Sequence, residues 1–305
     1  MITDAFGPGS LEPPVWYGPL REPSWLVPRV RDDAARVLFC AEPWQASAVG
    51  GAGRDLRLGL PLFLAEALRF GTDARAVVMR TPVPEPERFP GAAMIVRTAV
   101  APEGEASIRV RVLDPSGVVV SETVREAHDE AMVAAVLEGL PRVCMDAVAS
   151  SGIRQVWSSV SRPPSGVALV SYVRGQRACL RVSDEAVPAT ADATSVADRR
   201  NDVRSILTGL GSLATSTSET FPALLFFGVL LAAHDVGSPV VGELRLQANA
   251  RCTIATDPHD PIYAMSALVL RIFGDRDTSE RRMDKLRALD DPMMHRWVAR
   301  VAAIA

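Results

Sequence analysis

The chain has 305 residues, of which 48% are hydrophobic and 23% are charged, so it is long and apolar enough for two domains with separate cores. This composition excludes a chain that is disordered throughout. The formal net charge of −3 and the pI near 5.9 supply no basic surface of the kind that nucleic-acid-binding proteins present, so no nucleic-acid partner is expected.

The beginning of the chain lacks the pattern of a secretion signal, because acids and prolines stand where a basic segment and an apolar run are required. The longest apolar run, Phe221–Ala233, is shorter than the roughly 20 residues that cross a bilayer, so we expect a buried helix and no membrane span. The cysteines are far apart and form no zinc-binding pattern. We therefore predict buried free thiols in a cytoplasmic protein; the four are Cys40, Cys144, Cys179 and Cys252.

Residues 1–35 contain six prolines, which fix the backbone and remove hydrogen-bond donors. Regular structure is not expected here. The aromatic residues Trp16, Tyr17 and Trp25 in this segment predict an irregular arm that lies across a folded surface. That surface belongs either to the same chain or to a neighbouring subunit.

The next stretch predicts a strand, a helix and a second strand. The strand Arg36–Cys40 is apolar throughout, Leu60–Phe70 has helical spacing, and Ala74–Arg80 returns as a strand parallel to the first. Between the first strand and the helix lies a glycine-rich loop with Gly51 and Gly53, the place where a phosphate-binding loop would stand. Its spacing matches no known nucleotide motif, which favours a flexible loop over a phosphate site.

Residues 92–126 predict a three-stranded β-meander, with a type I turn at Asp114–Gly117. Apolar residues alternate with arginines, the pattern of a sheet that is wet on one face. Two interpretations remain open: the arginines form an anion-binding face, or they line a solvated face and pair with glutamates. The residues concerned are Arg97, Arg109, Arg111 and Arg125, and Glu103, Glu122 and Glu126.

Helical patterns dominate the rest of the chain. A helix is expected over 129–149, where Asp129 is a candidate N-cap, and residues 183–201 have the composition of a linker. Further helices are predicted over 202–213, 222–233, 239–256, 261–273, 278–289 and 292–304. Asp257-Pro258 and Asp291-Pro292 are 34 residues apart, the period of a tetratricopeptide repeat, so a degenerate helical-repeat array is favoured over an unrelated bundle.

The order of elements in the first half resembles the TolB amino-terminal-like domain, which is also found in FlgO-type flagellar proteins. The segments that carry the resemblance are VLFCAEPW at 37–44, GLPLFLAEAL at 59–68, AMIVRTAV at 93–100, ASIRVRVLDPSGVVVSE at 106–122 and ALVSYVRGQRA at 168–178. The resemblance implies an α/β domain followed by tetratricopeptide repeats in a regulatory protein. It implies no catalytic residues.

We therefore expect an α+β chain with a proline-rich arm over 1–35, a TolB-like α/β domain over 36–160, a connecting segment and linker over 161–201, and an all-α, tetratricopeptide-like domain over 202–305. No complete catalytic, metal or cofactor motif is present: Asp257–Pro261 and His128–Glu130 are interpreted as a turn and a helix cap.

The leading hypothesis is a non-enzymatic scaffold or regulatory subunit that binds another protein and needs no cofactor, with its working surface in the arm and the helical half. Oligomerisation is left open. The candidate anchors are Trp16, Tyr17, Trp25, Trp44 and Trp297. The alternatives are an anion or small-ligand sensor that uses Gly51, Gly53, Arg97, Arg109 and Arg111, and an enzyme of unrecognised type.

Overall fold

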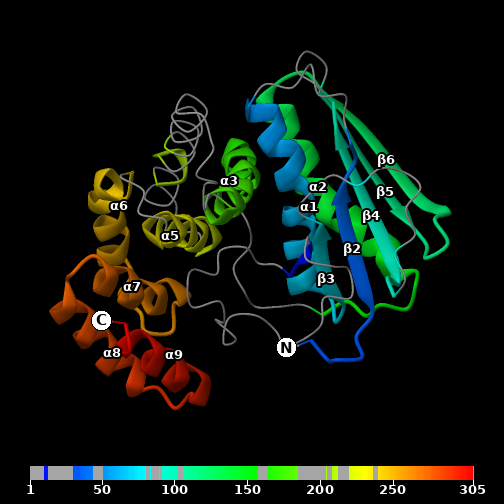
Figure 1. Ribbon diagram of the computed structural model, residues 1–305. Helices are drawn as coiled ribbons and strands as arrows, with labels where there is room; N and C mark the ends of the chain where they lie inside the picture. The colour runs from blue at the N-terminus through cyan, green and yellow to red at the C-terminus, as the bar shows by residue number, and fades with distance from the viewer. Residues whose placement is uncertain are drawn as a thin grey trace, which may run out of the picture. The chain divides into compact units, whose positions relative to one another are not determined.

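The computed structural model describes residues 10–12, 30–43, 51–79, 83, 89, 91–101, 106–156, 164–184, 204, 208–211, 220–235 and 240–304. These residues form two compact units. The first unit holds the described residues up to 156 together with 165–177, and the second holds residue 164 and those from 178 onward. The described part of the first unit contains a sheet with helices, and that of the second contains helices (Figure 1), which confirms the α+β class.

The first unit is built on a six-stranded sheet with the strand order β1-β3-β2-β4-β5-β6. The strands are β1 (Ser10–Leu11), β2 (Arg36–Ala41), β3 (Arg75–Met79), β4 (Met94–Val100), β5 (Ala106–Leu113) and β6 (Val119–Ala127). β2 is parallel to β3 and to β4, and β4, β5 and β6 form an antiparallel meander. The parallel pair and the meander agree with the sequence prediction. The strand β1, which pairs with β3, lies where the sequence predicted no regular structure, so that prediction is wrong at this point.

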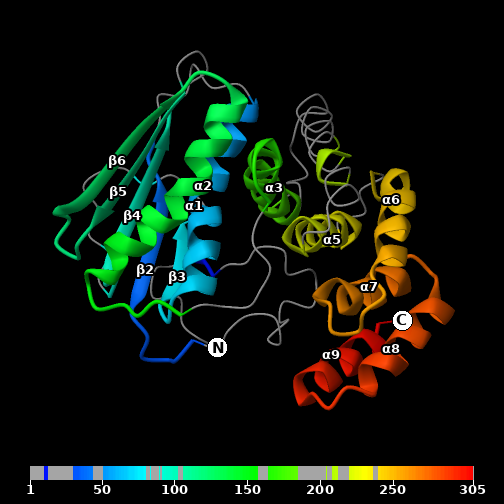
Figure 2. The same ribbon diagram turned by 180° about the vertical axis from the view of Figure 1, so that it is seen from behind.

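Two helices cover one face of this sheet, as Figures 1 and 2 show: α1 (Gly51–Gly71) packs on β2, β3 and β4, and α2 (Glu130–Ala149) packs on β5 and β6. α1 begins at Gly51 instead of near Leu60, so Pro61 lies inside the helix and the predicted loop is shorter than expected. Leu56 and Leu58 are buried. Their burial stabilises the helical conformation in this stretch, although its glycines give it a weak helix propensity.

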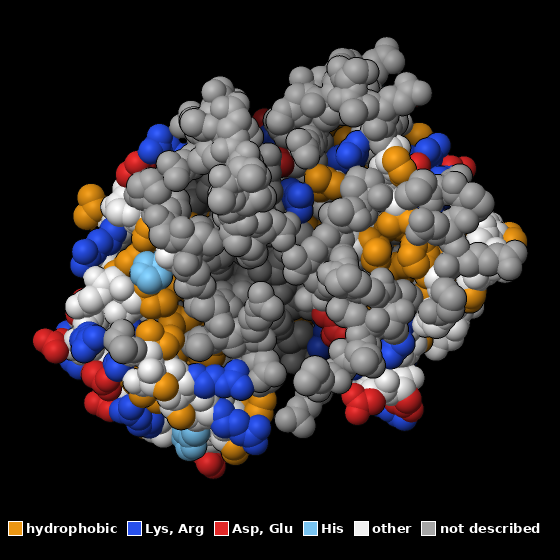
Figure 3. Space-filling model, in the orientation of Figure 1, with side chains coloured by type: hydrophobic (Ala, Val, Ile, Leu, Met, Phe, Trp, Pro, Cys, Tyr) orange, Lys and Arg blue, Asp and Glu red, His pale blue; other side chains and the backbone are white. Residues whose placement is uncertain are grey.

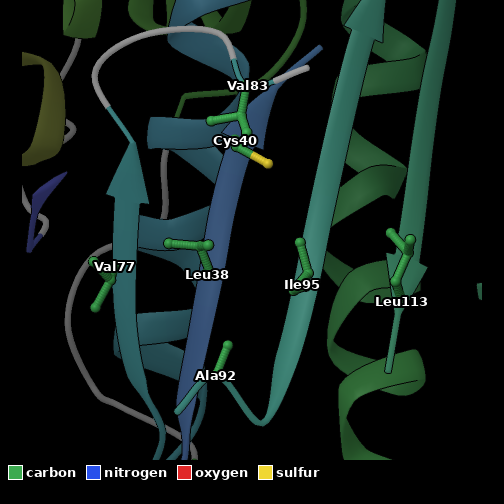
Figure 4. Close-up of a cluster of buried hydrophobic side chains, with 7 residues drawn as sticks. All are labelled: Leu38, Cys40, Val77, Val83, Ala92, Ile95 and Leu113. Carbon is green, nitrogen blue, oxygen red and sulfur yellow. The ribbon is translucent and has the colours of Figure 1, made fainter. Parts of the chain in front are cut away.

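A cluster of apolar side chains covers part of the opposite face of the sheet (Figure 4). Leu38 and Cys40 of β2, Val77 of β3 and Ile95 of β4 contribute to it together with Leu113 of β5. Val83 and Ala92, from the connection between β3 and β4, are buried in the same cluster. β2 and β4 are therefore buried on both faces, and the prediction of a wet face is wrong for β4.

A further helix, α3 (Val167–Asp184), begins in the segment for which only a connection was expected, and its residues up to Arg177 pack in the first unit. It approaches α1 very closely at Gly59, where a Cβ atom would lie 2.0 Å from the carbonyl oxygen of Val173. Nearby, the buried Glu66 of α1 accepts hydrogen bonds from the Tyr172 hydroxyl (2.5 Å) and from Nε2 of Gln176 (3.2 Å). These polar contacts fix the pairing of α1 with α3.

The described helices of the second unit include α5 (Thr220–Asp235), α6 (Val240–Ile254), α7 (Pro261–Ile272), α8 (Arg276–Arg287) and α9 (Pro292–Ala302). All five were predicted, with ends within a few residues of those observed. The stretch from Phe221 to Leu231 in α5 is buried on every side, as expected for a helix without a polar face. α7 packs against α5, α6, α8 and α9, so it forms the centre of this unit.

Candidate functional site

Glu42 lies at the carboxyl end of β2, next to the end of β4, because its backbone N–H donates to the carbonyl of Thr98 (2.8 Å). Glu42 is 7% exposed, and its carboxylate binds two arginines of β5. Arg109 Nη2 donates to Oε2 at 2.6 Å, Arg111 Nε donates to Oε1 at 2.9 Å, and Arg111 Nη2 donates to Oε1 as well. The carboxylate thus joins the end of β2 to the middle of β5.

Arg97 of β4 belongs to the same face of the sheet, since it lies directly opposite Arg111 in the strand register. It is 2% exposed, and its Nη1 donates to the carbonyl of Val83 at 3.4 Å. The structure thus brings Arg97, Arg109 and Arg111 to one face, as predicted, but Arg125 lies opposite Ile108 on the other face, so the prediction is wrong for Arg125. The expectation of a solvated face is wrong around Arg97. Arg109 and Arg111 are paired with Glu42, and no ion pair among the described residues joins them to Glu122 or Glu126. Glu103 lies outside the described residues.

The glycines of the anion-binding alternative lie elsewhere. Gly51 and Gly53 form the first turn of α1, a helix that covers the face of the sheet opposite to the arginines. Any anion that bound Arg109 and Arg111 would also have to compete with Glu42, which already accepts their hydrogen bonds. The five residues of this alternative are therefore divided between two faces of the sheet.

Glu42 should make the stability of the first unit depend on pH. Burial alone would raise the pKa of its carboxyl group, but hydrogen bonds from Arg111 and Arg109 outweigh burial and hold the pKa below the ordinary 4.5. A carboxyl with a lowered pKa stabilises the fold above pH 4.5, and this stabilisation disappears as the pH falls through the lowered value. We expect Glu42→Gln to reduce the free energy of unfolding at pH 7 by about 2 kcal/mol, because two partly buried arginines lose their carboxylate.

Urea unfolding of both proteins at pH 7 and pH 3 measures this effect. The difference between them should shrink at the lower pH, because the Glu42 carboxyl of the unfolded chain takes up a proton below pH 4.5 while that of the folded chain resists it. Glu122→Gln, which neutralises an exposed carboxylate on the same sheet, should change the free energy of unfolding by less than about 0.5 kcal/mol. A difference for Glu42→Gln that is equal at both pH values would contradict the assigned role.

Of the five aromatic anchors proposed from the sequence, the structure describes Trp297. Trp16, Tyr17, Trp25 and Trp44 lie outside the described residues. Trp297 is 3% exposed, and its indole Nε1 donates to the carbonyl of Ala264 at 3.2 Å, which places it in the core of the second unit. The prediction that Trp297 anchors a partner is therefore wrong, because a side chain with no exposed surface cannot be reached.

The strand β6 exposes a surface that sequence reasoning did not identify. Four valines beside or within it are between 45% and 61% exposed, although valine is usually buried in folded proteins; they are Val118, Val119, Val120 and Val124. β6 is the last strand of the sheet, so its outer edge pairs with no other described strand. The run of three valines was the available signal, but alternation alone does not distinguish an edge strand from a central one.

A second exposed apolar surface lies on α6, where Leu246 and Ile254 are largely accessible. By contrast, acidic and basic side chains are interspersed over α8 and α9 on the face of the second unit that Figure 3 shows. Mixed charge of this kind is typical of ordinary solvated surface. Further exposed apolar side chains occur singly at Met132, Val156 and Val167, so among the described residues β6 and α6 carry more than one each.

The described residues contain no group of three or more histidines, cysteines, aspartates or glutamates that could hold a metal ion. Cys40, Cys144 and Cys252 are buried free thiols, as predicted, and burial raises the pKa of Cys144 and of Cys252 to about 12. Both thiols are therefore protonated at neutral pH and are poor nucleophiles. Asp129 caps α2, as the interpretation of His128–Glu130 predicts. Asp260, in the segment Asp257–Pro261 that was interpreted as a turn, caps α7.

No helix among the described residues combines the length and apolarity that a bilayer crossing requires. A comparison with known protein families finds no match, and a comparison with curated proteins finds none either. The resemblance to TolB-like domains and to tetratricopeptide repeats therefore stays a prediction.

Proposed function

We propose that this protein is a non-enzymatic scaffold or regulatory subunit that binds another protein, and that β6 is its docking surface. The observation that carries the proposal is a nine-residue strand at the edge of the sheet with four exposed valines beside or within it. This differs from the expectation from sequence, which assigned binding to the arm and the helical half.

An edge strand presents a row of backbone N–H and C=O groups that an added strand can pair with. Proteins usually protect such edges with prolines, lysines or very short strands. β1, at the other edge, is only two residues long. β6 contains neither proline nor lysine, and its charged side chains are Glu122, Arg125 and Glu126, which oppose an added strand of like charge but not one of matching charge. Its one register irregularity lies near its start, at Val112/Leu113 of β5, which leaves Ser121–Ala127 regular. An extended segment of a partner can therefore be added along β6.

The second unit supports the same class of function. Its helices pack in sequence order, with α7 against α5, α6 and α8, as expected when one helical pair stacks on the preceding pair. We propose that this unit is a degenerate tetratricopeptide-like array that accompanies the TolB-like domain. Arrays of this kind serve protein recognition in many unrelated contexts, which agrees with a scaffold role.

The proposal predicts that charges placed on β6 abolish partner binding. The full chain and a Val120→Lys/Val124→Lys variant are immobilised, and proteins captured from the native cell lysate are quantified by mass spectrometry. Lysines on an edge strand oppose strand addition, so we expect the variant to lose the proteins that the unchanged chain enriches. Circular dichroism and urea unfolding establish that the variant is folded.

The matched control is Leu246→Lys/Ile254→Lys, which removes two apolar side chains of α6 in the other unit that are even more exposed than Val120 and Val124. It should retain the captured proteins. If the β6 variant captures the same proteins as the unchanged chain, β6 is not the docking surface. If the α6 variant alone loses them, the interaction belongs to the second unit.

A further inference from the structure

Three side chains of β6 project from the face of the sheet on which Glu42 binds Arg109 and Arg111. In the register, Glu122 lies opposite Arg111, Val124 opposite Arg109 and Glu126 opposite Ser107. All three side chains of β6 are exposed. Because they are two residues apart, they form a line of acidic, apolar and acidic groups along the strand.

The two glutamates lack counterions within the described part of the chain: no ion pair there involves Glu122 or Glu126. Arg111 would be the natural partner of Glu122, but its guanidinium is held by Glu42 on the other side of β5. Arg109 is held by the same carboxylate. The arginines of β5 are thus engaged with β2, and the carboxylates of β6 remain available.

The other face of β6 has a different character. Ser121, Thr123 and Arg125 lie opposite Val112, Val110 and Ile108 in the register, on the side that α2 covers. This face carries hydroxyl groups and one arginine, and the Nη1 of Arg125 donates to the carbonyl of Val124. Glu122 and Glu126 therefore favour basic residues on one face of an added strand, whereas Arg125 is the charged group on the helix side.

A second copy of β6 meets a charge conflict when it pairs with this edge in the register centred on Val124. In a symmetric antiparallel pair centred on Val124, Glu122 of one copy would lie opposite Glu126 of the other. Like charges directly opposite each other across a strand pair are destabilising. A strand that places basic residues opposite Glu122 and Glu126 avoids this repulsion and is favoured at this edge.

We propose that β6 receives an extended segment of a partner protein in which a basic, an apolar and a basic residue alternate on the face opposite Glu122, Val124 and Glu126. This inference rests on the proposed function and specifies the chemistry of the partner. Backbone pairing with β6 supplies the attachment, the central apolar residue buries Val124, and the two basic residues neutralise the carboxylates. The pattern is the same when it is read in either direction, so it fits a parallel or an antiparallel segment.

Three nine-residue peptides, capped at both ends, test the inference with the full chain. Each has valine at the centre and threonine elsewhere, with arginine, glutamine or glutamate two residues before and after the valine. Fluorescence anisotropy gives the Kd at low and at high salt. We expect the arginine peptide to bind about tenfold more tightly than the glutamine peptide at low salt, with the glutamate peptide weakest. High salt should reduce the differences.

Variants identify the groups responsible. Glu122→Gln/Glu126→Gln should remove the preference for the arginine peptide, and Glu122→Arg/Glu126→Arg should invert it toward the glutamate peptide. The matched control is Asp277→Asn/Asp290→Asn, which makes the same change in net charge at exposed positions of the second unit and should leave all three affinities unchanged. Inversion by the arginine variant distinguishes charge matching at β6 from a general attraction to an acidic protein.

The outcomes separate the inference from the function on which it rests. The three peptides could bind equally, with their binding abolished by Val120→Lys/Val124→Lys. This result would overturn the charge pattern and leave strand addition intact. If no peptide binds while capture from lysate still depends on β6, the inference is likewise overturned and the proposed function stands. If neither peptide binding nor capture depends on β6, both are wrong.

Discussion

Gly59→Ala is expected to lower the free energy of unfolding of the first unit by about 2–4 kcal/mol, although the change is a single methyl group. The Cβ would lie 2.0 Å from the carbonyl oxygen of Val173 and 2.9 Å from its carbonyl carbon. Both atoms belong to the backbone of α3, so they cannot move aside without displacing that helix. The close approach of α1 and α3 thus requires glycine at this position.

The displacement should also disturb the polar contacts beside it. Glu66 is buried and accepts a hydrogen bond from the Tyr172 hydroxyl, one residue before Val173. A shift of α3 would weaken this bond and leave the buried carboxylate of Glu66 with one hydrogen-bond donor fewer, which lowers the free energy of unfolding further. Urea unfolding measures the loss of stability. In hydrogen exchange, Gly59→Ala should accelerate exchange relative to the unchanged protein more strongly at the amides of α3 than at those of β2.

Gly139→Ala is the matched control, because it makes the same change inside α2, where the added Cβ meets nothing within 4 Å. Alanine has the higher helix propensity, so this variant should be more stable by about 0.5–1 kcal/mol. If Gly59→Ala behaves like Gly139→Ala, then α3 does not pack against α1 as described.

Arg282→Met is expected to destabilise the second unit by about 3 kcal/mol. The guanidinium of Arg282 is almost fully buried, and it joins three helices. Nη1 donates to the carbonyl of Ala255 (2.9 Å) and to the Ser266 hydroxyl (2.8 Å), and Nη2 donates to the carbonyl of Cys252. Two of these acceptors lie at the carboxyl end of α6, where unpaired carbonyls favour a cation.

The same guanidinium lies 4.3 Å from the centre of the Tyr263 ring, which adds a cation–π contact. Burial lowers the pKa of Arg282, but an arginine stays protonated at any pH at which the protein is folded. Methionine fills a similar volume without donating a hydrogen bond, so the carbonyls of Cys252 and Ala255 would lose this donor. The loss in stability should therefore not depend on pH between about 5 and 8.

Arg281→Met is the matched control, since Arg281 is the exposed neighbour on the same helix and should tolerate the change within about 0.5 kcal/mol. Hydrogen exchange localises the effect: Arg282→Met should accelerate exchange at the end of α6 and in α7. Equal stability of the two variants would show that Arg282 does not hold these helices together.

Local features of this protein were predictable because their causes lie within a few residues of each other. Asp129 caps α2 by accepting from the backbone N–H of Met132 (2.8 Å), as its position before the helix predicts. Asp114 organises the turn between β5 and β6 by accepting from the N–H groups of Ser116 and Val118, and Gly117 takes the positive φ that this turn needs. Such contacts form whenever the chain is locally folded, so sequence is sufficient.

Long-range contacts were not predictable in the same way. Glu42 binds arginines 67 and 69 residues further along the chain, and no local pattern connects them. Gly59 was an ordinary residue before a predicted helix until the structure placed α3 against it. The burial of Trp297 likewise depends on α7, since its partner Ala264 lies 33 residues away.

Apart from β1 and α3, the amino-acid sequence alone determined the succession of the strands and helices described above. It also determined the turn at Asp114, the cap at Asp129 and the division into a sheet-containing half and a helical half, because periodicity and capping act over one or two turns of chain. The tertiary structure decided which strand lies at the edge and which arginines have a counterion. Strand order depends on connections between distant segments, so the same alternating pattern yields a buried strand in β4 and an exposed one in β6. The candidate docking surface follows from that order.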